Sequence, residues 1–528
     1  MVAVLAAVAV ARLRLLNFPL ERDEGEYAYA GQLLLQGIPP YQLAYNMKFP
    51  GTYAAYAAIM ALFGQTPAGI HFGVLCLTTL TALMLFWLGR QMLDWTAGMV
   101  AATSYTVLAA SPAMLGLAGH ATHFAAFFAT AGLCLMWKAR QNASGRIGFA
   151  AGVLFGIGIL MKQHVALIGL WALSAFTVQQ VRQTQSPPAR RLGLVVTFGA
   201  GIILPFSLSC LILWHAGVFE KFWFWTIDYA RQYESVISLD QAPQIFGERL
   251  CRLAATDPLL WFVAAAGLGL VWFDKRLQPV RLWFLGFCLV SALTVVPGYY
   301  FRKHYFLLSL PAVALLAGCT VSGTRQLWSQ RVKNPRLGDW PVWCYLLMVT
   351  VTIVARSDIW FVKTRIQIAR TLYGADPLPE SEIIAQYIHN NSEPDVRVAV
   401  LGSEPEIYFL AHRHSATGYI YTYAQMEPQP FALNMQNEMI RDIETKKPEY
   451  IVFADNIMSW NRRPDSHPEI FNWWDSYQTN YTLVGMADII SSTQTVYALG
   501  ANWVARYGKN IHGSGLEVYQ RNAAGSSH

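Results

Sequence analysis

Long apolar runs alternate with short polar segments over the first two thirds of the chain. The runs lie near residues 1–16, 54–88, 97–117, 121–137, 147–161, 165–178, 192–214, 258–273, 281–297, 305–320 and 340–355. Since roughly 20 apolar residues cross a bilayer upright, this pattern predicts about eleven transmembrane helices, several of them short. The expected fold class is a polytopic α-helical membrane protein.

The pattern changes after about Ala375, where polar residues become as frequent as in soluble proteins. VRVAVLGS and EYIVFAD are typical of buried strands, and the strands and helix predicted in this part lie at 396–403, 449–455, 481–488, 492–498, 516–521 and, for the helix, 427–446. We predict a transmembrane domain over residues 1–356, a soluble α/β domain over 375–522 and a flexible tail over 523–528.

The composition and the charge pattern agree with a membrane protein. Hydrophobic residues make up 54% and charged residues 13% of the 528 positions, which is unusual for a soluble enzyme. The formal charge of +7 comes from basic clusters between apolar runs, at Arg90, 138–146, 182–191, 275–281 and 325–336. Such clusters are topology determinants, so nucleic acid is not predicted as a partner.

The same basic clusters predict the orientation of the chain. All five fall on one side of the predicted membrane, and the positive-inside rule makes that side cytoplasmic. The loops at 18–53, 118–123, 162–164, 215–257 and 298–304 and the chain after residue 356 are therefore expected on the periplasmic side of a bacterial inner membrane. At this interface we expect Arg12 and Arg14 to snorkel, and residues 220–234 to form an amphipathic helix with its aromatic side chains toward lipid.

Ionisable groups are concentrated in the predicted outer loops. The segment FPLERDEGEYAY (18–29) contains Glu21, Asp23, Glu24 and Glu26, and the other groups are Lys48 in KFPG, His120 and His123 in GHATHF, Lys162 in LMKQH, and Arg302, Lys303 and His304 in GYYFRKHYF. Charges at a membrane boundary are costly to desolvate, which favours a functional role or a neutralising partner. The predicted topology brings all of them to one face.

One carboxylate cluster with several cations fits group transfer from an anionic lipid carrier. A carboxylate can take the proton of an acceptor hydroxyl, while cations stabilise a departing phosphate. A glycosidase would instead need two carboxylates flanking the bond. The alternative from another class is a transporter or flippase of lipid-linked sugars, which would use the same cations without a base.

Four segments resemble the GT-C glycosyltransferases, in particular the bacterial family 39-like group of protein O-mannosyltransferases and aminoarabinose transferases. They are ERDEGEYAY, KFPG, GILMKQHVAL and GYYFRKHYFLLSLPA, in that order, within residues 18–320. The resemblance implies a polyprenyl-phosphate donor such as an undecaprenyl-phosphate sugar, inverting transfer of a hexosyl or pentosyl group, and a protein, lipid or glycan acceptor.

The resemblance also implies roles for individual residues. Asp23 matches the catalytic base and Glu24 the second acid, and the groups that match donor-phosphate ligands are Lys48, Arg302, His304 and Lys162. The candidate substrate contacts are His120, His123, Glu26, Lys303 and Tyr299. The chain departs from the family in GHATHF, where many relatives carry an acid. No metal site is predicted and no cofactor is required, although His120 and His123 together with Glu24 are compatible with a divalent metal.

Overall fold

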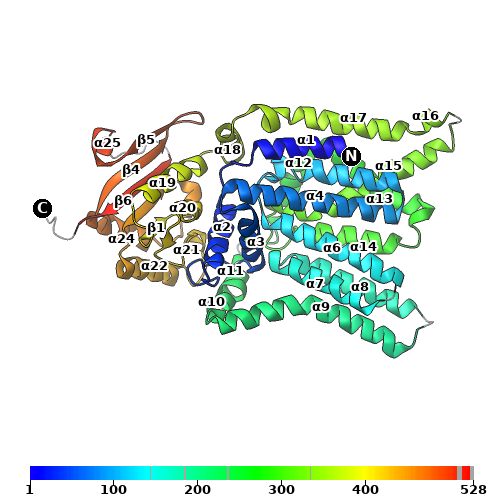
Figure 1. The fold of residues 1–528 in the computed structure, drawn as a ribbon, viewed down its shortest axis with the longest axis horizontal. Coiled ribbons are helices and arrows are strands. Elements are labelled where there is room, and N and C mark those ends of the chain that lie inside the picture. Colours follow the sequence, from blue (N-terminus) through cyan, green and yellow to red (C-terminus); the bar gives the residue numbers. More distant parts are fainter. Residues whose placement is uncertain (143, 184–185, 235–236, 333, 508–513, 524–528) are drawn as a thin grey trace.

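The computed structural model has two parts that follow one another along its long axis, a bundle of helices and a domain built on a sheet (Figure 1). The structure describes residues 1–528 except 143, 184–185, 235–236, 333, 508–513 and 524–528. Nearly all of the predicted tail thus lies outside the described residues. The chain is a polytopic helical membrane protein with a small C-terminal sheet domain, as the hydropathy pattern predicted.

Each predicted apolar run contains at least one helix. The elements of this part are α1 (Val2–Arg14), α2 (Arg22–Leu35), α3 (Gly51–Phe63), α4 (Pro67–Met92), α5 (Trp95–Leu108), η1 (Pro112–Met114), α6 (Ala121–Asn142), α7 (Gly145–Met161), α8 (Val165–Arg182), α9 (Pro188–His215), α10 (Phe219–Trp223), η2 (Phe224–Tyr229), α11 (Ala230–Glu234), α12 (Ala242–Thr256), α13 (Pro258–Phe273), η3 (Lys275–Leu277), α14 (Arg281–Leu293), η4 (Lys303–Ser309), α15 (Leu310–Ser329), α16 (Pro335–Gly338), α17 (Trp340–Ala355) and η5 (Asp358–Val362).

The number of helices that are long enough to cross a membrane is smaller than the eleven spans predicted. Among the described residues, four helices are long and apolar enough to cross a membrane, namely α4, α8, α9 and the continuous stretch Lys303–Ser329; the bent pair α12–α13 would make a fifth. The predicted run 54–88 is divided, because α3 stops at Gly64 and Thr66 caps the start of α4 by accepting a hydrogen bond from the Gly69 N–H.

The short helices α2 and α3 lie across the end of the bundle, between the long helices and the sheet domain (Figure 1). Residues Glu24 to Leu33 of α2 are all buried. A helix that is buried on every side must contact protein throughout, and α2 packs on α3 as well as on α20 (Glu406–Ala411) of the sheet domain. The polar residues of α2 therefore lie at the junction of the two parts.

The C-terminal part is a mixed six-stranded sheet with helices. Its elements are α18 (Arg365–Tyr373), α19 (Leu378–Asn390), β1 (Arg397–Leu401), α20, β2 (His414–Ser415), α21 (Tyr423–Met426), α22 (Ala432–Lys446), β3 (Tyr450–Asp455), α23 (Ile457–Trp460), α24 (Glu469–Tyr477), η6 (Gln478–Asn480), β4 (Tyr481–Ile489), β5 (Thr495–Leu499), α25 (Ala501–Tyr507) and β6 (Gly515–Arg521). The strand order is β2-β1-β3-β6-β4-β5, with β1 parallel to β2 and β3 and the other pairs antiparallel.

The five strands predicted from the sequence are confirmed. β1, β3 and β4 are mostly buried, as apolar runs inside a sheet are, whereas β5 lies at the edge of the sheet and is largely exposed or half-buried. The helix predicted over 427–446 begins only at Ala432, since Pro428 and Pro430 precede it. GSEPE (402–406) forms the turn from β1 to α20, as expected of a strand-to-helix connection.

Residues 220–234 are helical, as predicted, over the consecutive elements α10, η2 and α11, but the predicted lipid-facing environment is wrong for three aromatic side chains. Phe222, Trp225 and Tyr229 are buried in protein. Trp225 packs near the ring of Tyr419, and the Tyr229 hydroxyl donates to Glu427 at 2.6 Å. Trp225 and Tyr229 thus face the C-terminal domain, whereas Phe222 packs on Tyr41 and Phe49 of the membrane part. The hydrophobic pattern alone cannot reveal either partner.

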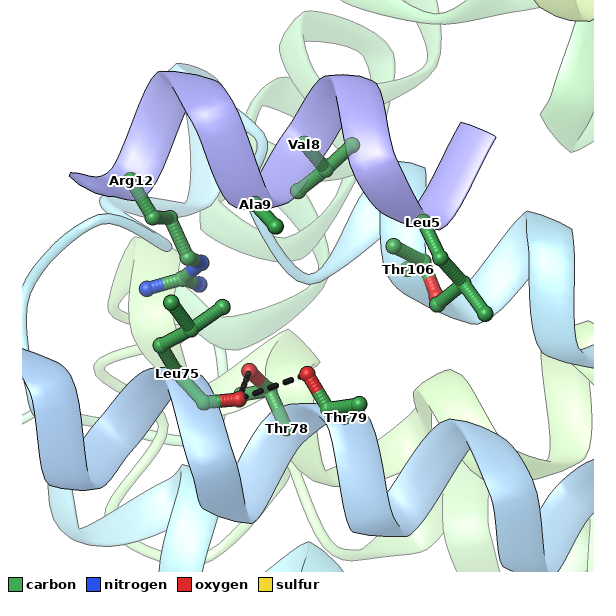
Figure 2. Close-up of a pocket in the computed structure, with 8 residues that line it drawn as sticks. All are labelled: Leu5, Val8, Ala9, Arg12, Leu75, Thr78, Thr79 and Thr106. Atoms are coloured by element: carbon green, nitrogen blue, oxygen red, sulfur yellow. Dashed lines mark hydrogen bonds between the residues drawn. The ribbon is translucent and has the colours of Figure 1, made fainter. Parts of the chain in front are cut away.

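Arg12 does not snorkel as predicted. Its side chain is only 6% exposed and extends from α1 toward Leu75 of α4, beside a cavity of about 10 Å³ that is too small for a substrate (Figure 2). Its guanidinium donates to the carbonyls of Ala109 (3.1 Å) and Gly116 (2.6 Å). Arg12 therefore holds the irregular segment 109–120, whose backbone carbonyls have no helical partners.

We expect the substitution Arg12→Leu to lower the thermal unfolding midpoint in detergent. The Ala109 carbonyl would lose the Arg12 donor in a buried place, at a cost of about 1–3 kcal/mol, and the Gly116 carbonyl would keep only its contact with His123 Nε2. Arg14→Leu is the matched control, because Arg14 is exposed and water can replace it at the carbonyls of Trp360 and Val362. Equal destabilisation by the two substitutions would contradict this role of Arg12.

Candidate active site

The acidic motif begins α2 with a reciprocal capping box. The Glu21 side chain accepts from the Glu24 N–H (3.3 Å), and the Glu24 carboxylate accepts from the Glu21 N–H (3.2 Å). Two otherwise unpaired backbone donors are satisfied in this way. Asp23 is thereby fixed in the first turn, where the helix dipole favours a negative charge.

Glu24 is a structural acid in this arrangement. It is fully buried, and its second oxygen accepts hydrogen bonds from His71 Nε2 (3.0 Å) and from the Gly119 N–H. These contacts tie α2 to α4 and to the loop before α6. The side chain is thus occupied, and it is Asp23 that faces the cations.

Lys48 lies between two carboxylates of α2. Its Nζ is 2.7 Å from Asp23 Oδ1 and 2.6 Å from Glu26 Oε2, and it lies over the ring of Tyr27 at 4.6 Å. Glu26 in turn accepts hydrogen bonds from the Tyr53 hydroxyl (2.6 Å) and from Asn46 Nδ2 (2.8 Å). Glu26 therefore contacts and supports Lys48. The role predicted for Glu26 was instead a contact with the substrate.

Two loops meet beside Lys48. The Lys48 carbonyl accepts from the Tyr41 hydroxyl at 2.7 Å, and Gln163 Nε2 donates to the carbonyl of Met47 at 3.0 Å. The loop that contains Lys162 is thus docked on the loop that contains Lys48. Lys162 Nζ lies 4.0 Å above the ring of Tyr305, the residue that follows His304.

His120 and His304 form the other wall around Asp23. Their rings stack with centroids 4.2 Å apart, His120 Nδ1 lies 3.3 Å from Glu21 Oε1, and His304 Nε2 lies 4.0 Å from Asp23 Oδ2. His304 was predicted as a phosphate ligand and His120 as a substrate contact, and both are next to the proposed base. Arg302 is held nearby by Tyr233, whose hydroxyl accepts from its Nη2 at 3.3 Å, and by the ring of Tyr300.

Burial and neighbouring charge shift the titration of these groups in different directions. Burial alone would raise the pKa of Asp23, but the Lys48 ammonium at hydrogen-bond distance lowers that pKa well below its usual value. Burial lowers the pKa of Lys162 to about 7, and the positive charges of Lys48 and Arg302 add to this effect. Burial likewise lowers the pKa of His120 to about 4, so its ring is neutral near pH 7.

Asp23, His120 and His304 are also the one set of potential metal ligands found within the described part of the chain, with donor atoms within 4.8 Å of one another. Two imidazoles and a carboxylate suit a zinc-like ion. The combination of His120 and His123 with Glu24 is not formed, because Glu24 is engaged by His71. That no metal is needed stays a prediction.

The remaining predicted contacts lie elsewhere. His123 is buried in α6 against the carbonyl of Gly116 (3.2 Å), and Lys303 is exposed beside Arg249 and Arg252. Tyr299 packs against the apolar core with a left-handed backbone, φ 56°. A cavity of 490 Å³ lined by Lys363, Gln367 and other residues of η5, α18 and the 492–493 turn contains none of the predicted site residues.

Sequence reasoning missed several residues of the site. His71 and Tyr53 lie within apolar helices and carry no local signal of their distant partners on α2. Arg22, in contrast, does carry a local signal of its role, because it is the single cation within the acidic motif ERDEGE. A lone cation among four acids is expected to have an acidic partner, and Arg22 is bound by Glu404 at 3.1 Å.

Comparisons with known proteins concern the fold and part of the sequence. Residues 48–208 match the sequence model of a family described as dolichyl-phosphate-mannose-protein mannosyltransferase. The crystal structure of ArnT from Cupriavidus metallidurans bound to undecaprenyl phosphate is similar, with a TM-score of 0.59, 16% identity, and coverage of 100% of this chain and 99% of that chain. Apo ArnT from the same organism gives a TM-score of 0.54 at 16% identity, covering 95% and 98% of the two chains.

A more distant structure is the oligosaccharyltransferase of Archaeoglobus fulgidus in complex with Zn and sulfate. It gives a TM-score of 0.50 at 12% identity, with coverage of 94% of this chain and 73% of that chain. No curated protein matches the chain significantly.

Over its whole length the fold is similar to that of ArnT. This likeness and the match of residues 48–208 confirm the resemblance to the GT-C glycosyltransferases that the four motifs indicated.

Proposed function

We propose that this protein moves a hexosyl or pentosyl group from a polyprenyl-phosphate donor to the hydroxyl of a protein, lipid or glycan acceptor, with inversion at the anomeric carbon. The site would open on the periplasmic side of a bacterial inner membrane. The observation that carries the proposal is the 2.7 Å contact between Lys48 Nζ and Asp23 Oδ1. A phosphate bound by Lys48 would present its sugar within reach of the Asp23 carboxylate.

The geometry suggests how donor binding prepares the base. Without donor, Lys48 neutralises Asp23 and Glu26, and it keeps the pKa of Asp23 too low for efficient proton abstraction. A donor phosphate would share the Lys48 ammonium. Because the attraction between Lys48 and Asp23 then weakens, the pKa of Asp23 rises toward the range of an effective general base.

The transfer step then balances as a single displacement. Asp23 accepts the proton of the acceptor hydroxyl, and the oxygen forms a bond to the anomeric carbon from the face opposite the phosphate. The bond between that carbon and the phosphate oxygen breaks, and the phosphate keeps the electron pair. Lys48 and Arg302, with Lys162 when it is protonated, would compensate the charge on the departing phosphate.

The test is a panel of radiolabelled polyprenyl-phosphate monosaccharides supplied to the purified protein in liposomes, with nucleotide sugars as the control donors. We expect release of polyprenyl phosphate with at least one lipid donor and none with a nucleotide sugar. Movement of the intact labelled lipid between leaflets, without release of sugar, would favour the transporter over the transferase.

A further inference from the structure

The first turn of α2 is held from outside the site as well as from within it. Arg22 directly precedes Asp23, and its side chain is only 6% exposed. Its guanidinium lies 3.1 Å from Asp376 Oδ1 and 3.1 Å from Glu404 Oε1, and it donates to the Met458 carbonyl at 2.6 Å. All three partners belong to the C-terminal part of the chain.

Glu404 is itself rigidly placed in the turn from β1 to α20. It is fully buried, and its Oε2 accepts hydrogen bonds from the Ser403 N–H (2.8 Å) and from Ser459 Oγ (2.7 Å). These bonds leave Oε1 for Arg22. A guanidinium bound by fixed carboxylates has a defined direction, which a flexible surface ion pair does not provide.

The next turn of α2 approaches the same domain through its backbone. A Cβ atom placed on Gly25 would lie 2.6 Å from the Glu406 N, so a glycine is required for this contact. Further along the helix, the Tyr29 hydroxyl accepts a hydrogen bond from the Ser415 N–H at 2.7 Å. The outward face of α2 is therefore docked on α20 and β2, while its inward face carries Asp23.

We infer that the C-terminal domain positions the catalytic helix, and that Arg22 and Glu404 are positioning residues for Asp23. The pair fixes the first turn of α2 and hence the direction of the Asp23 carboxylate toward Lys48. This inference rests on the proposed function of Asp23. It gives the C-terminal domain a role in the chemical step.

The substitution Glu404→Gln tests the pair. Glutamine keeps one oxygen for Ser403 and Ser459 but turns an amide donor toward the Arg22 guanidinium. We expect kcat to fall by between about 10-fold and 100-fold, the usual effect of a displaced catalytic group, with KM for the donor within about twofold of wild type. Amide hydrogen exchange in the first turns of α2 should become faster. Arg22→Lys should act in the same direction, because lysine cannot reach both carboxylates.

The matched control is Glu438→Gln. Glu438 of α22 binds Lys221 of α10 at 2.6 Å, so it also joins the C-terminal domain to the membrane part, but away from α2. We expect normal kcat and normal exchange in α2. An equal fall of kcat in both variants would mean that domain attachment alone matters and would overturn the inference.

The two proposals fail in different ways. Unchanged kcat and exchange in Glu404→Gln, with Asp23→Asn inactive, would refute the positioning role and leave the proposed function intact. Full turnover in Asp23→Asn would refute the proposed base, and the positioning role with it, whatever the exchange in α2 shows.

Discussion

Asp23→Asn is expected to lower kcat of sugar transfer by between about 10²-fold and 10⁴-fold, the range that a general base contributes. Asparagine has the same shape, and its carbonyl oxygen still accepts a hydrogen bond from Lys48, so the site should keep its arrangement. Donor binding should be retained or become tighter, because Lys48 loses one of its two carboxylate partners. Single-turnover kinetics with labelled donor, alongside equilibrium donor binding, separates these effects.

The control for this experiment is Glu26→Gln. It also removes one negative charge from Lys48, but it leaves Asp23 in place. We expect a much smaller fall of kcat than in Asp23→Asn. If the two variants lose turnover equally, the loss reflects the charge around Lys48, and Asp23 is not the base.

Lys48→Met is expected to weaken donor binding and to lower kcat by about 10²-fold to 10³-fold, as does the loss of one group that stabilises transition-state charge. It should also move the acidic limb of the pH profile. Lys48 lowers the pKa of Asp23, so its removal raises that pKa, and protonation of the base then begins at a higher pH. The acidic fall of kcat should therefore start at a higher pH than in wild type.

Lys221→Met serves as the comparison for that variant. Lys221 is another cation near the C-terminal domain, but its partner is Glu438 and its charge is not directed at Asp23. Its pH profile should match that of wild type. An acidic limb that stays in place in Lys48→Met would show that Lys48 does not control the protonation of Asp23.

Local sequence determines part of this site. The spacing of Glu21 and Glu24 is that of a capping box, and it explains why several acids cluster at the start of α2: two cap the helix, one faces the cations and one supports Lys48. Five strands of the C-terminal domain could likewise be predicted, because each is a short run bounded by turn residues. These features depend on neighbours in the chain.

The remaining features of the fold and the site depend on tertiary contacts, which the periodicity of apolar positions does not reveal. An apolar helix face looks the same whether lipid or protein covers it, and so Phe222, Trp225 and Tyr229 were assigned to the wrong environment. In the same way, Arg12 has the sequence context of an interface residue, although it binds the carbonyls of a loop about 100 positions later. Both wrong predictions concern the groups that a side chain contacts in the folded protein.

Arg22 and Glu404 are far apart in the sequence, so the ribosome synthesises them at different times. The two are 382 residues apart, so at about 5–20 residues per second roughly 20–80 s of translation separate the appearance of the helix from that of its partner. In the last part of that time, after His304 has been made, a growing chain contains every acid and cation of the membrane site but lacks the contact that orients the first turn of α2. Synthesis of the last third of the chain is thus also the step that assembles the enzyme, and a prematurely terminated product would carry the acidic motif without its arrangement.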